Sequence, residues 1–70
     1  MKVYFRNSNG KKILIGNAKD NDEAMKVINE FCDERGFKIY YTRMWIDGDN
    51  QNITWIDVGD HLCFFLIERD

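Results

Sequence analysis

The chain has 70 residues and a formal net charge of −2, and 44% of its residues are hydrophobic and 14% aromatic. This length allows a single domain, residues 1–70, and this apolar content excludes intrinsic disorder. The longest apolar run has the length of a strand and falls short of the roughly 20 residues of a membrane helix. The N-terminal residues Met1 to Arg6 are charged from the second residue and lack the apolar stretch of a signal peptide. We therefore expect a cytoplasmic protein with no membrane contact, in which Cys32 and Cys63 are free thiols.

The first predicted elements are two short strands joined by a tight turn. Residues 2–6 and 12–16 are rich in β-branched and aromatic side chains. Between them, the dipeptide Asn9-Gly10 favours the positive φ angles of a hairpin turn. The N-terminal segment is therefore predicted to form a β-hairpin.

A helix is predicted to begin after Asp20 and to end before Gly36. Asp20 is a suitable N-cap, with Glu23 three residues later as in a capping box, and glycine is the usual residue after a helix C-terminus. Apolar residues recur in between with helical spacing, and we expect them to be buried as one stripe: Ala24, Val27, Ile28, Phe31 and Cys32.

Three further strands are predicted, at residues 37–46, 53–58 and 61–68. Six polar residues separate the first two, and Gly59-Asp60 separates the last two as a two-residue turn of type II′. The element order is then ββαβββ, with the last three strands forming a meander. Since one helix cannot enclose a core alone, the expected fold is α+β, a mainly antiparallel five-stranded sheet with one helix packed on one face.

The tight turn also predicts which side chains share a face of the sheet. The expected cross-strand pairs are Val58–His61, Ile56–Cys63 and Thr54–Phe65 on one face, and Trp55–Phe64 and Ile53–Leu66 on the other. Both faces are apolar, yet a single helix covers only one. The second face is then an exposed patch, the interface of a homodimer, or a surface folded inward by the twist of the sheet.

No set of residues has the spacing of a catalytic, cofactor or metal site. Cys32, His61 and Cys63 lack the fourth ligand of a structural zinc site. A cysteine and a histidine two residues apart on a strand are also too distant for a nucleophile and its base. Residues 47–58 begin like a calcium loop but lack its glycine and its bidentate glutamate. We therefore predict that the protein is not an enzyme and needs no cofactor or metal.

The segment Thr-Trp-Ile-Asp-Val-Gly-Asp-His-Leu-Cys-Phe-Phe, residues 54–65, resembles the C-terminal hairpin of small uncharacterised proteins of phages and prophages of Gram-positive bacteria. Residues 20–24 and the pattern Tyr-Tyr-x-Arg-x-Trp at 40–45 are similar to the same group, in which Ser usually stands at the position of Asp60. The resemblance implies a phage or prophage origin, and it implies no activity, cofactor or site residue.

Charge is distributed unequally along the chain. Residues 1–44 carry nine Lys and Arg against six Asp and Glu, whereas residues 45–70 carry one against six. Such asymmetry indicates a partner surface, and it is equally expected of acidic loops without a partner. Our leading hypothesis is a small accessory protein that binds a host or phage protein through aromatic and acidic residues of the second half: Trp45, Asp47, Asp49, Trp55, Asp57 and Asp60.

The alternative hypothesis is a nucleic-acid-binding module. It would use the cations of the N-terminal hairpin: Lys2, Arg6, Lys11 and Lys12. The low isoelectric point, near 5.3, opposes this alternative because nucleic-acid-binding domains usually present a basic face.

Overall fold

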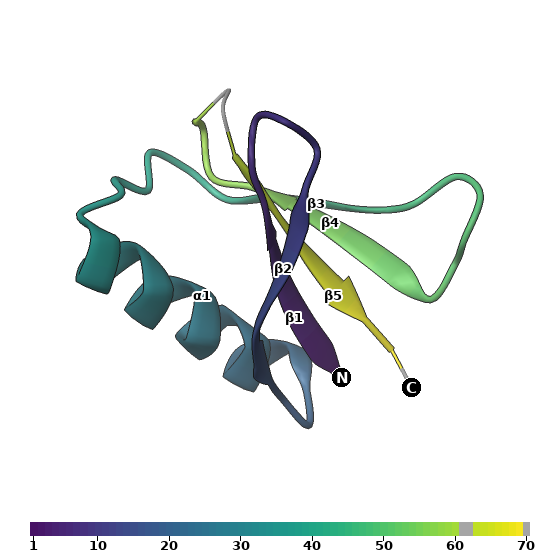
Figure 1. Cartoon of the computed structure of the whole chain (residues 1–70). Helices are drawn as coiled ribbons and strands as arrows, with labels where there is room; N and C mark the ends of the chain where they lie inside the picture. The colour runs from purple at the N-terminus through teal and green to yellow at the C-terminus, as the bar shows by residue number, and fades with distance from the viewer. Residues whose placement is uncertain (61–62, 70) are drawn as a thin grey trace.

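The computed structural model describes residues 1–60 and 63–69. Its elements, in chain order, are β1 (Lys2–Arg6), β2 (Lys12–Asn17), α1 (Asn21–Arg35), β3 (Arg43–Ile46), β4 (Ile53–Asp57) and β5 (Phe64–Glu68). The strands pair antiparallel in one five-stranded sheet of order β2-β1-β5-β4-β3 (Figure 1). The predicted α+β fold, with a single helix and a β3–β4–β5 meander, is confirmed.

The β1–β2 hairpin closes through a three-residue loop. Asn7 N–H donates to the Lys11 carbonyl at 3.0 Å, and Gly10 N–H donates to the Asn7 carbonyl at 2.9 Å. Gly10 has a φ of 82°, a left-handed conformation that a residue with a Cβ rarely adopts. Further along, the pairing register shifts between Val3 and Tyr4, so that Ile15 is an extra residue and β2 bulges there.

Helix α1 begins and ends where the sequence predicts. The Asp20 carboxylate accepts a hydrogen bond from Glu23 N–H at 2.8 Å, and Gly36 forms a left-handed C-cap with a φ of 70°. Ala24, Ile28 and Cys32 are buried as expected, whereas Val27 and Phe31 are only half-buried. Within the described residues, no helix is both long and apolar enough to span a bilayer.

Several predicted strand boundaries are wrong. Residues 37–42 are not a strand, and β3 begins at Arg43. The reason is visible in the backbone, because the N–H groups of Tyr40 and Tyr41 both donate to the carbonyl of Val58, at 2.9 and 3.4 Å. A regular antiparallel ladder cannot direct two successive amides to one acceptor. Strand β4 also ends at Asp57, one residue earlier than predicted.

The predicted register between β4 and β5 is wrong by two residues. Ile56 pairs with Phe65 and Trp55 with Leu66, because the chain between Val58 and Cys63 is longer than a two-residue turn. Within this connection, Cys63 N–H donates to the Asp60 carbonyl at 3.4 Å. A shift of two residues preserves the alternation of side chains, so the predicted face is unchanged for the residues within β4 and β5. Of the predicted start of the last strand, His61 and Leu62 lie outside the described residues, and Cys63 precedes the strand, because β5 begins at Phe64.

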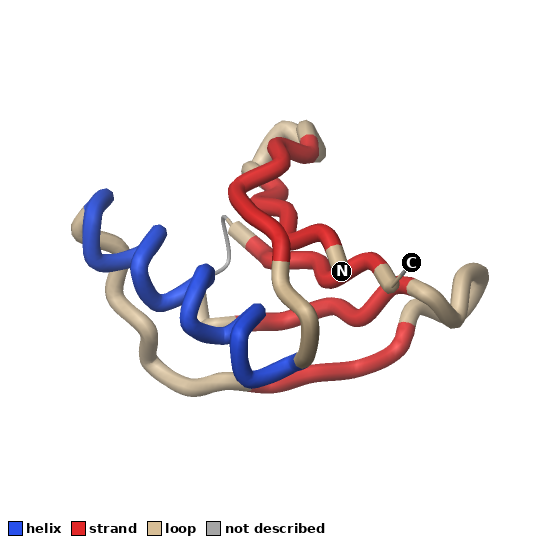
Figure 2. Tube along the Cα trace, turned by 90° about the horizontal axis from the view of Figure 1, so that it is seen from below, coloured by secondary structure: helices blue, strands red, loops and turns tan. Residues whose placement is uncertain are grey.

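The core fills the space between α1 and one face of the curved sheet (Figure 2). Its largest fully buried side chains come from the helix, from the three central strands and from Val58 just after β4: Val3, Ile28, Cys32, Ile56, Val58, Phe65 and Ile67. Phe5 and Phe31 pack against Phe65 and against each other near the helix C-terminus, and Phe37 packs against both of them, with ring centroids of these pairs 4.9 to 6.1 Å apart. The opposite face of the sheet is left uncovered by the helix.

Candidate functional site

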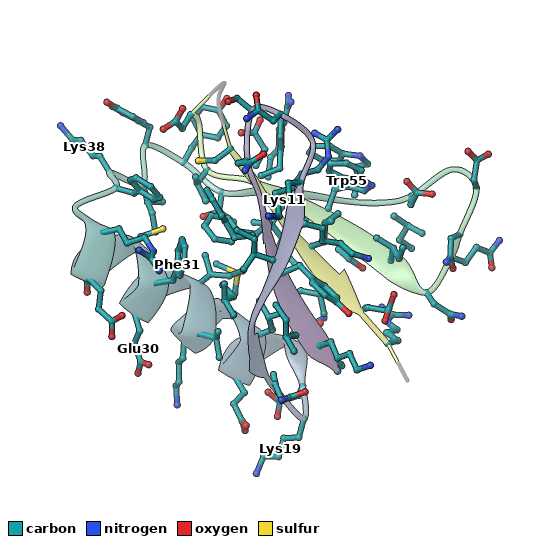
Figure 3. All side chains as sticks on the ribbon, viewed as in Figure 1. Lys11, Lys19, Glu30, Phe31, Lys38 and Trp55 are labelled. Carbon is teal, nitrogen blue, oxygen red and sulfur yellow. The ribbon has the colours of Figure 1, made fainter. Side chains whose placement is uncertain are left out.

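We call the sheet face opposite α1 the outer face. Strand alternation and the observed registers assign its side chains: Lys12, Leu14, Lys2, Tyr4, Arg6, Phe64, Leu66, Glu68, Ile53, Trp55, Asp57, Arg43 and Trp45. In Figure 3, Phe31 and Trp55 lie on opposite sides of β1 and β2, Phe31 toward the helix and Trp55 away from it.

One row of apolar side chains crosses the outer face from edge to edge. Its members pair in turn across all five strands: Leu14, Tyr4, Leu66, Trp55 and Trp45. Leu66 is buried beneath its neighbours, Tyr4 and Trp55 are half-buried, and Trp45 and Leu14 are 41% and 51% exposed. The row therefore presents a continuous, partly exposed apolar surface.

The two indole rings form the centre of this surface. Trp45 and Trp55 are direct cross-strand partners, with ring centroids 6.2 Å apart and planes inclined by only 2°. Phe64 packs edge-on against both rings, at 6.4 and 5.8 Å between centroids. Such aromatic contacts restrain each other's rotamers, so the pair is a preorganised platform.

Cations lie against the rings of the outer face. The Arg6 guanidinium is 5.4 Å from the ring centroid of Trp55, and that of Arg43 is 5.7 Å from Trp45. At the far edge, the Lys12 ammonium lies 4.3 Å from the ring of Tyr4. All three distances lie within the range of cation–π attraction.

Asp47 anchors the loop beside the indole pair. Its Oδ1 accepts a hydrogen bond from Trp55 Nε1 at 2.8 Å, and its Oδ2 accepts from the N–H groups of Asp49 and Asn50 at 3.0 and 2.9 Å. These bonds, that from Trp55 most of all, hold the pKa of the Asp47 carboxyl below its ordinary value because they stabilise the charged form.

Asp57 is 8% exposed, and its carboxylate is also engaged within the chain. Its Oδ1 accepts from Gly59 N–H at 2.9 Å, and its Oδ2 is approached by Arg43 Nη2 at 3.4 Å and by the Tyr41 hydroxyl at 3.5 Å. The Asp57 carboxylate thus orients Arg43, its cross-strand partner, beside Trp45.

Four of the six residues predicted to bind a protein come together: Trp45, Asp47, Trp55 and Asp57. Asp49 lies in the loop next to Asp47, whereas Asp60 lies at the other end of β4, close to Cys63. The sequence did not predict that Arg6 and Arg43 lie on the same face as the indole rings. That placement depends on the β1–β5 and β3–β4 registers.

The cations of the alternative hypothesis are divided between a face and a turn. Lys2, Arg6 and Lys12 belong to the outer face, and Lys11 lies in the hairpin turn. The outer face thus gathers three of these four cations with both indole rings, a juxtaposition that the sequence pattern alone did not indicate.

The two thiols belong to the core. Cys32 and Cys63 are free and buried, and burial is the main cause that raises the pKa of both, that of Cys63 to about 11. Within residues 1–60 and 63–69, no three His, Cys, Asp or Glu side chains are grouped to hold a metal ion. His61, the third residue of the zinc pattern considered above, lies outside the described residues.

Comparison with known proteins finds no matching family model, no matching curated protein and no matching solved structure. Inference about function therefore depends on the chemistry of the outer face.

Proposed function

We propose that this protein is a non-enzymatic binding protein that contacts another protein through its outer face. The observation that carries the proposal is the stacked Trp45–Trp55 pair, which the helix leaves uncovered and which Arg6 and Arg43 flank. Tryptophan, tyrosine and arginine are the residues most enriched among those that dominate the binding energy of protein interfaces.

The charges of the outer face favour a partner surface that is apolar at its centre and acidic around it. Four cations belong to the face, against the two carboxylates Asp57 and Glu68: Lys2, Arg6, Lys12 and Arg43. Asp57 and the neighbouring Asp47 are already engaged in hydrogen bonds within the chain. Asp49, at the tip of the acidic loop, would form part of the rim, where charges affect association rate and specificity more than affinity.

Nucleic-acid binding is the second candidate, favoured by the gathering of Lys2, Arg6 and Lys12 on the face that carries the indole rings. Single-stranded nucleic acids bind where bases stack on aromatic side chains in a basic groove. Here, however, guanidinium groups already lie against both indoles, and the net charge of the chain is −2. These features favour a protein partner.

The biological setting of the proposal comes from the resemblance of residues 54–65 to phage and prophage proteins. A small accessory protein of this kind would act in the bacterial cytoplasm on a host or phage protein. Its fold offers what that role needs, a rigid sheet that presents preorganised aromatic side chains.

Affinity capture from a Gram-positive bacterial lysate, with and without nuclease, tests the proposal. The test compares the wild type with Trp45→Ala and with Tyr40→Ala, a matched control whose aromatic side chain is 65% exposed in the loop before β3. We expect to capture a protein that is retained after nuclease treatment. Trp45→Ala should bind this protein about 10- to 100-fold more weakly than the wild type, as for an interface hot spot, and Tyr40→Ala should bind it as tightly as the wild type.

Recovery of only DNA or RNA, lost with nuclease and steeply with added salt, would instead support the second candidate. A captured protein that binds Trp45→Ala as tightly as the wild type would contradict the use of the outer face. Circular dichroism of both variants checks that each retains the fold.

A further inference from the structure

Strand β3 is an edge strand with an exposed apolar sequence. It lies at one end of the sheet order and pairs only with β4 among the described residues. Met44, Trp45 and Ile46 are 44%, 41% and 55% exposed, so both faces of the strand are open. Edge strands of this kind readily pair with another strand.

The opposite edge of the sheet, β2, carries protection that β3 lacks. Strand β2 has a bulge at Ile15 and an exposed lysine, Lys12, and both features oppose edge-to-edge pairing. Strand β3 pairs with β4 in continuous register, and its one charged residue, Arg43, is engaged by Asp57 of its own chain. This contrast indicates that β3, and not β2, is the edge that pairs.

The backbone of β3 determines which groups are available to a partner. Asp47 N–H donates to the Ile53 carbonyl at 2.9 Å, so the amide of Asp47 points toward β4. Because backbone groups alternate in direction along an antiparallel strand, Arg43 and Trp45 also direct their N–H and C=O groups toward β4. Met44 and Ile46 therefore direct theirs outward.

We propose that β3 pairs antiparallel with β3 of a second copy of this chain, about a two-fold axis at Trp45. In this register Met44 lies opposite Ile46 of the second copy, and the outward N–H and C=O groups of these residues bond to each other as a hydrogen-bonded pair. Trp45 lies opposite Trp45 of the second copy, a non-hydrogen-bonded pair, where side chains approach most closely. The interface is self-complementary, as two-fold symmetry requires.

Charge complementarity selects this register among those that the backbone allows. Arg43 lies opposite Asp47 of the second copy, and the symmetry makes this ion pair twice. Arg43 is 70% exposed and would lie between that carboxylate and Asp57 of its own chain, 3.4 Å away. Sliding the strands to the next allowed register places Trp45 opposite Arg43 or Asp47 and removes both Arg43–Asp47 pairs.

The proposed dimer joins two five-stranded sheets into one and leaves the protected β2 strands at its ends. Because both β3 edges are used, the assembly closes as a dimer and does not extend into a filament. It also brings the two Trp45–Trp55 pairs together in one larger outer face. The inference goes beyond the proposed function and does not depend on it, since self-association can be measured without the other partner.

Sedimentation equilibrium of full-length charge-exchange variants at micromolar concentrations tests the pairing. Arg43→Asp alone and Asp47→Arg alone each place like charges opposite each other, so each variant should weaken its own dimer at least about 10-fold. A mixture of the two variants restores opposite charges at both positions. It should form a heterodimer of twice the 8.4 kDa mass of the chain.

A second pair of variants tests the edge itself and does not alter the bonds of Asp47. Ile46→Lys places a charge on β3, and Leu14→Lys, at a similar exposure of 51%, places one on β2. We expect Ile46→Lys to be a folded monomer by circular dichroism and sedimentation, and Leu14→Lys to remain a dimer.

Three results would overturn the proposal. The first is a wild-type chain that sediments as an 8.4 kDa monomer at all these concentrations. The second is a dimer or filament that Leu14→Lys disrupts and Ile46→Lys does not. The third is a failure of the mixed charge variants, each folded, to associate.

Discussion

The indole N–H of Trp55 donates a hydrogen bond to the carboxylate of Asp47 across 2.8 Å. This bond joins the first residue of the β3–β4 loop to the middle of β4. The same carboxylate accepts two N–H groups of the loop, those of Asp49 and Asn50. One ionised side chain therefore holds the conformation of the loop and the orientation of the indole ring.

Stability should depend on the ionisation of Asp47 at acidic pH. Its folded-state pKa lies below the ordinary value of 3.8, chiefly because of the Trp55 hydrogen bond. The associated stabilisation is present above the unfolded pKa and is lost as the pH falls through the folded one. We expect Asp47→Asn, whose amide oxygen still accepts hydrogen bonds, to lose less stability than the wild type between pH 5 and strongly acid pH.

Urea unfolding followed by tryptophan fluorescence at several pH values measures this difference. Asp49→Asn is the matched control, because it changes a neighbouring loop carboxylate that accepts none of the three bonds to Asp47. Equal acid dependence of the wild type and Asp47→Asn would show that the Asp47 charge does not stabilise the loop.

Gly16 permits the close contact of β2 with α1, and we predict that Gly16→Ala destabilises the fold. A Cβ at this position would lie 2.9 Å from Val27 Cγ1, closer than carbon atoms approach each other. Relieving the overlap by movement of the strand or the helix should cost about 1–3 kcal/mol, as for other overpacked sites. Chemical denaturation gives the value.

A double-mutant cycle with Val27→Ala assigns that cost to the contact. Val27→Ala removes the methyl groups that the new Cβ would meet, so the double variant should be more stable than the sum of the two single effects predicts. Additive effects would indicate that Gly16→Ala acts on the backbone of β2 or on the unfolded chain.

Local signals made the helix and the first hairpin predictable from the sequence. The Asp20–Glu23 cap and the Gly36 cap each depend on residues within one turn of the helix end. The β4–β5 register was not predictable in this way. Gly59-Asp60 has the composition of a tight turn, but the longer connection to Cys63 moved the register by two residues.

Only the two rings of the indole platform could be predicted from the sequence, and the cations beside them could not. Trp45 and Trp55 belong to neighbouring strands of a meander, and their shared face follows from alternation. Arg6 reaches Trp55 only because β1 pairs with β5, two strands that are distant in the sequence. No local pattern encodes that pairing, so the basic character of the outer face could be seen only in the structure.

The two central phenylalanines should differ in their contribution to stability. Phe65 is fully buried, whereas Phe31 is half-buried and carries the Arg35 guanidinium 4.5 Å from its ring. Phe65→Ala should cost about 3–5 kcal/mol, the range of buried aromatic truncations, and Phe31→Ala should cost less because part of its cavity opens to solvent. Equilibrium denaturation of both variants, with coincident circular dichroism and fluorescence transitions, compares them directly.

The buried thiol of Cys63 should make the fold sensitive to alkaline pH. Its pKa is raised from 9.0 to about 11, first by burial and then by the charge of Asp60. The unfolded chain ionises near the lower value, so stability is complete below pH 9 and falls as the pH rises toward 11. Cys63→Ala should reduce this loss of stability at alkaline pH, whereas Cys32→Ala should retain the part of the loss that Cys63 causes.

Alkylation with iodoacetamide provides an independent measurement of the Cys63 thiol. Near pH 8, the thiolate fraction of native Cys63 should be on the order of 100-fold smaller than that of an ordinary thiol. Native alkylation of Cys63 as fast as in urea would contradict its burial.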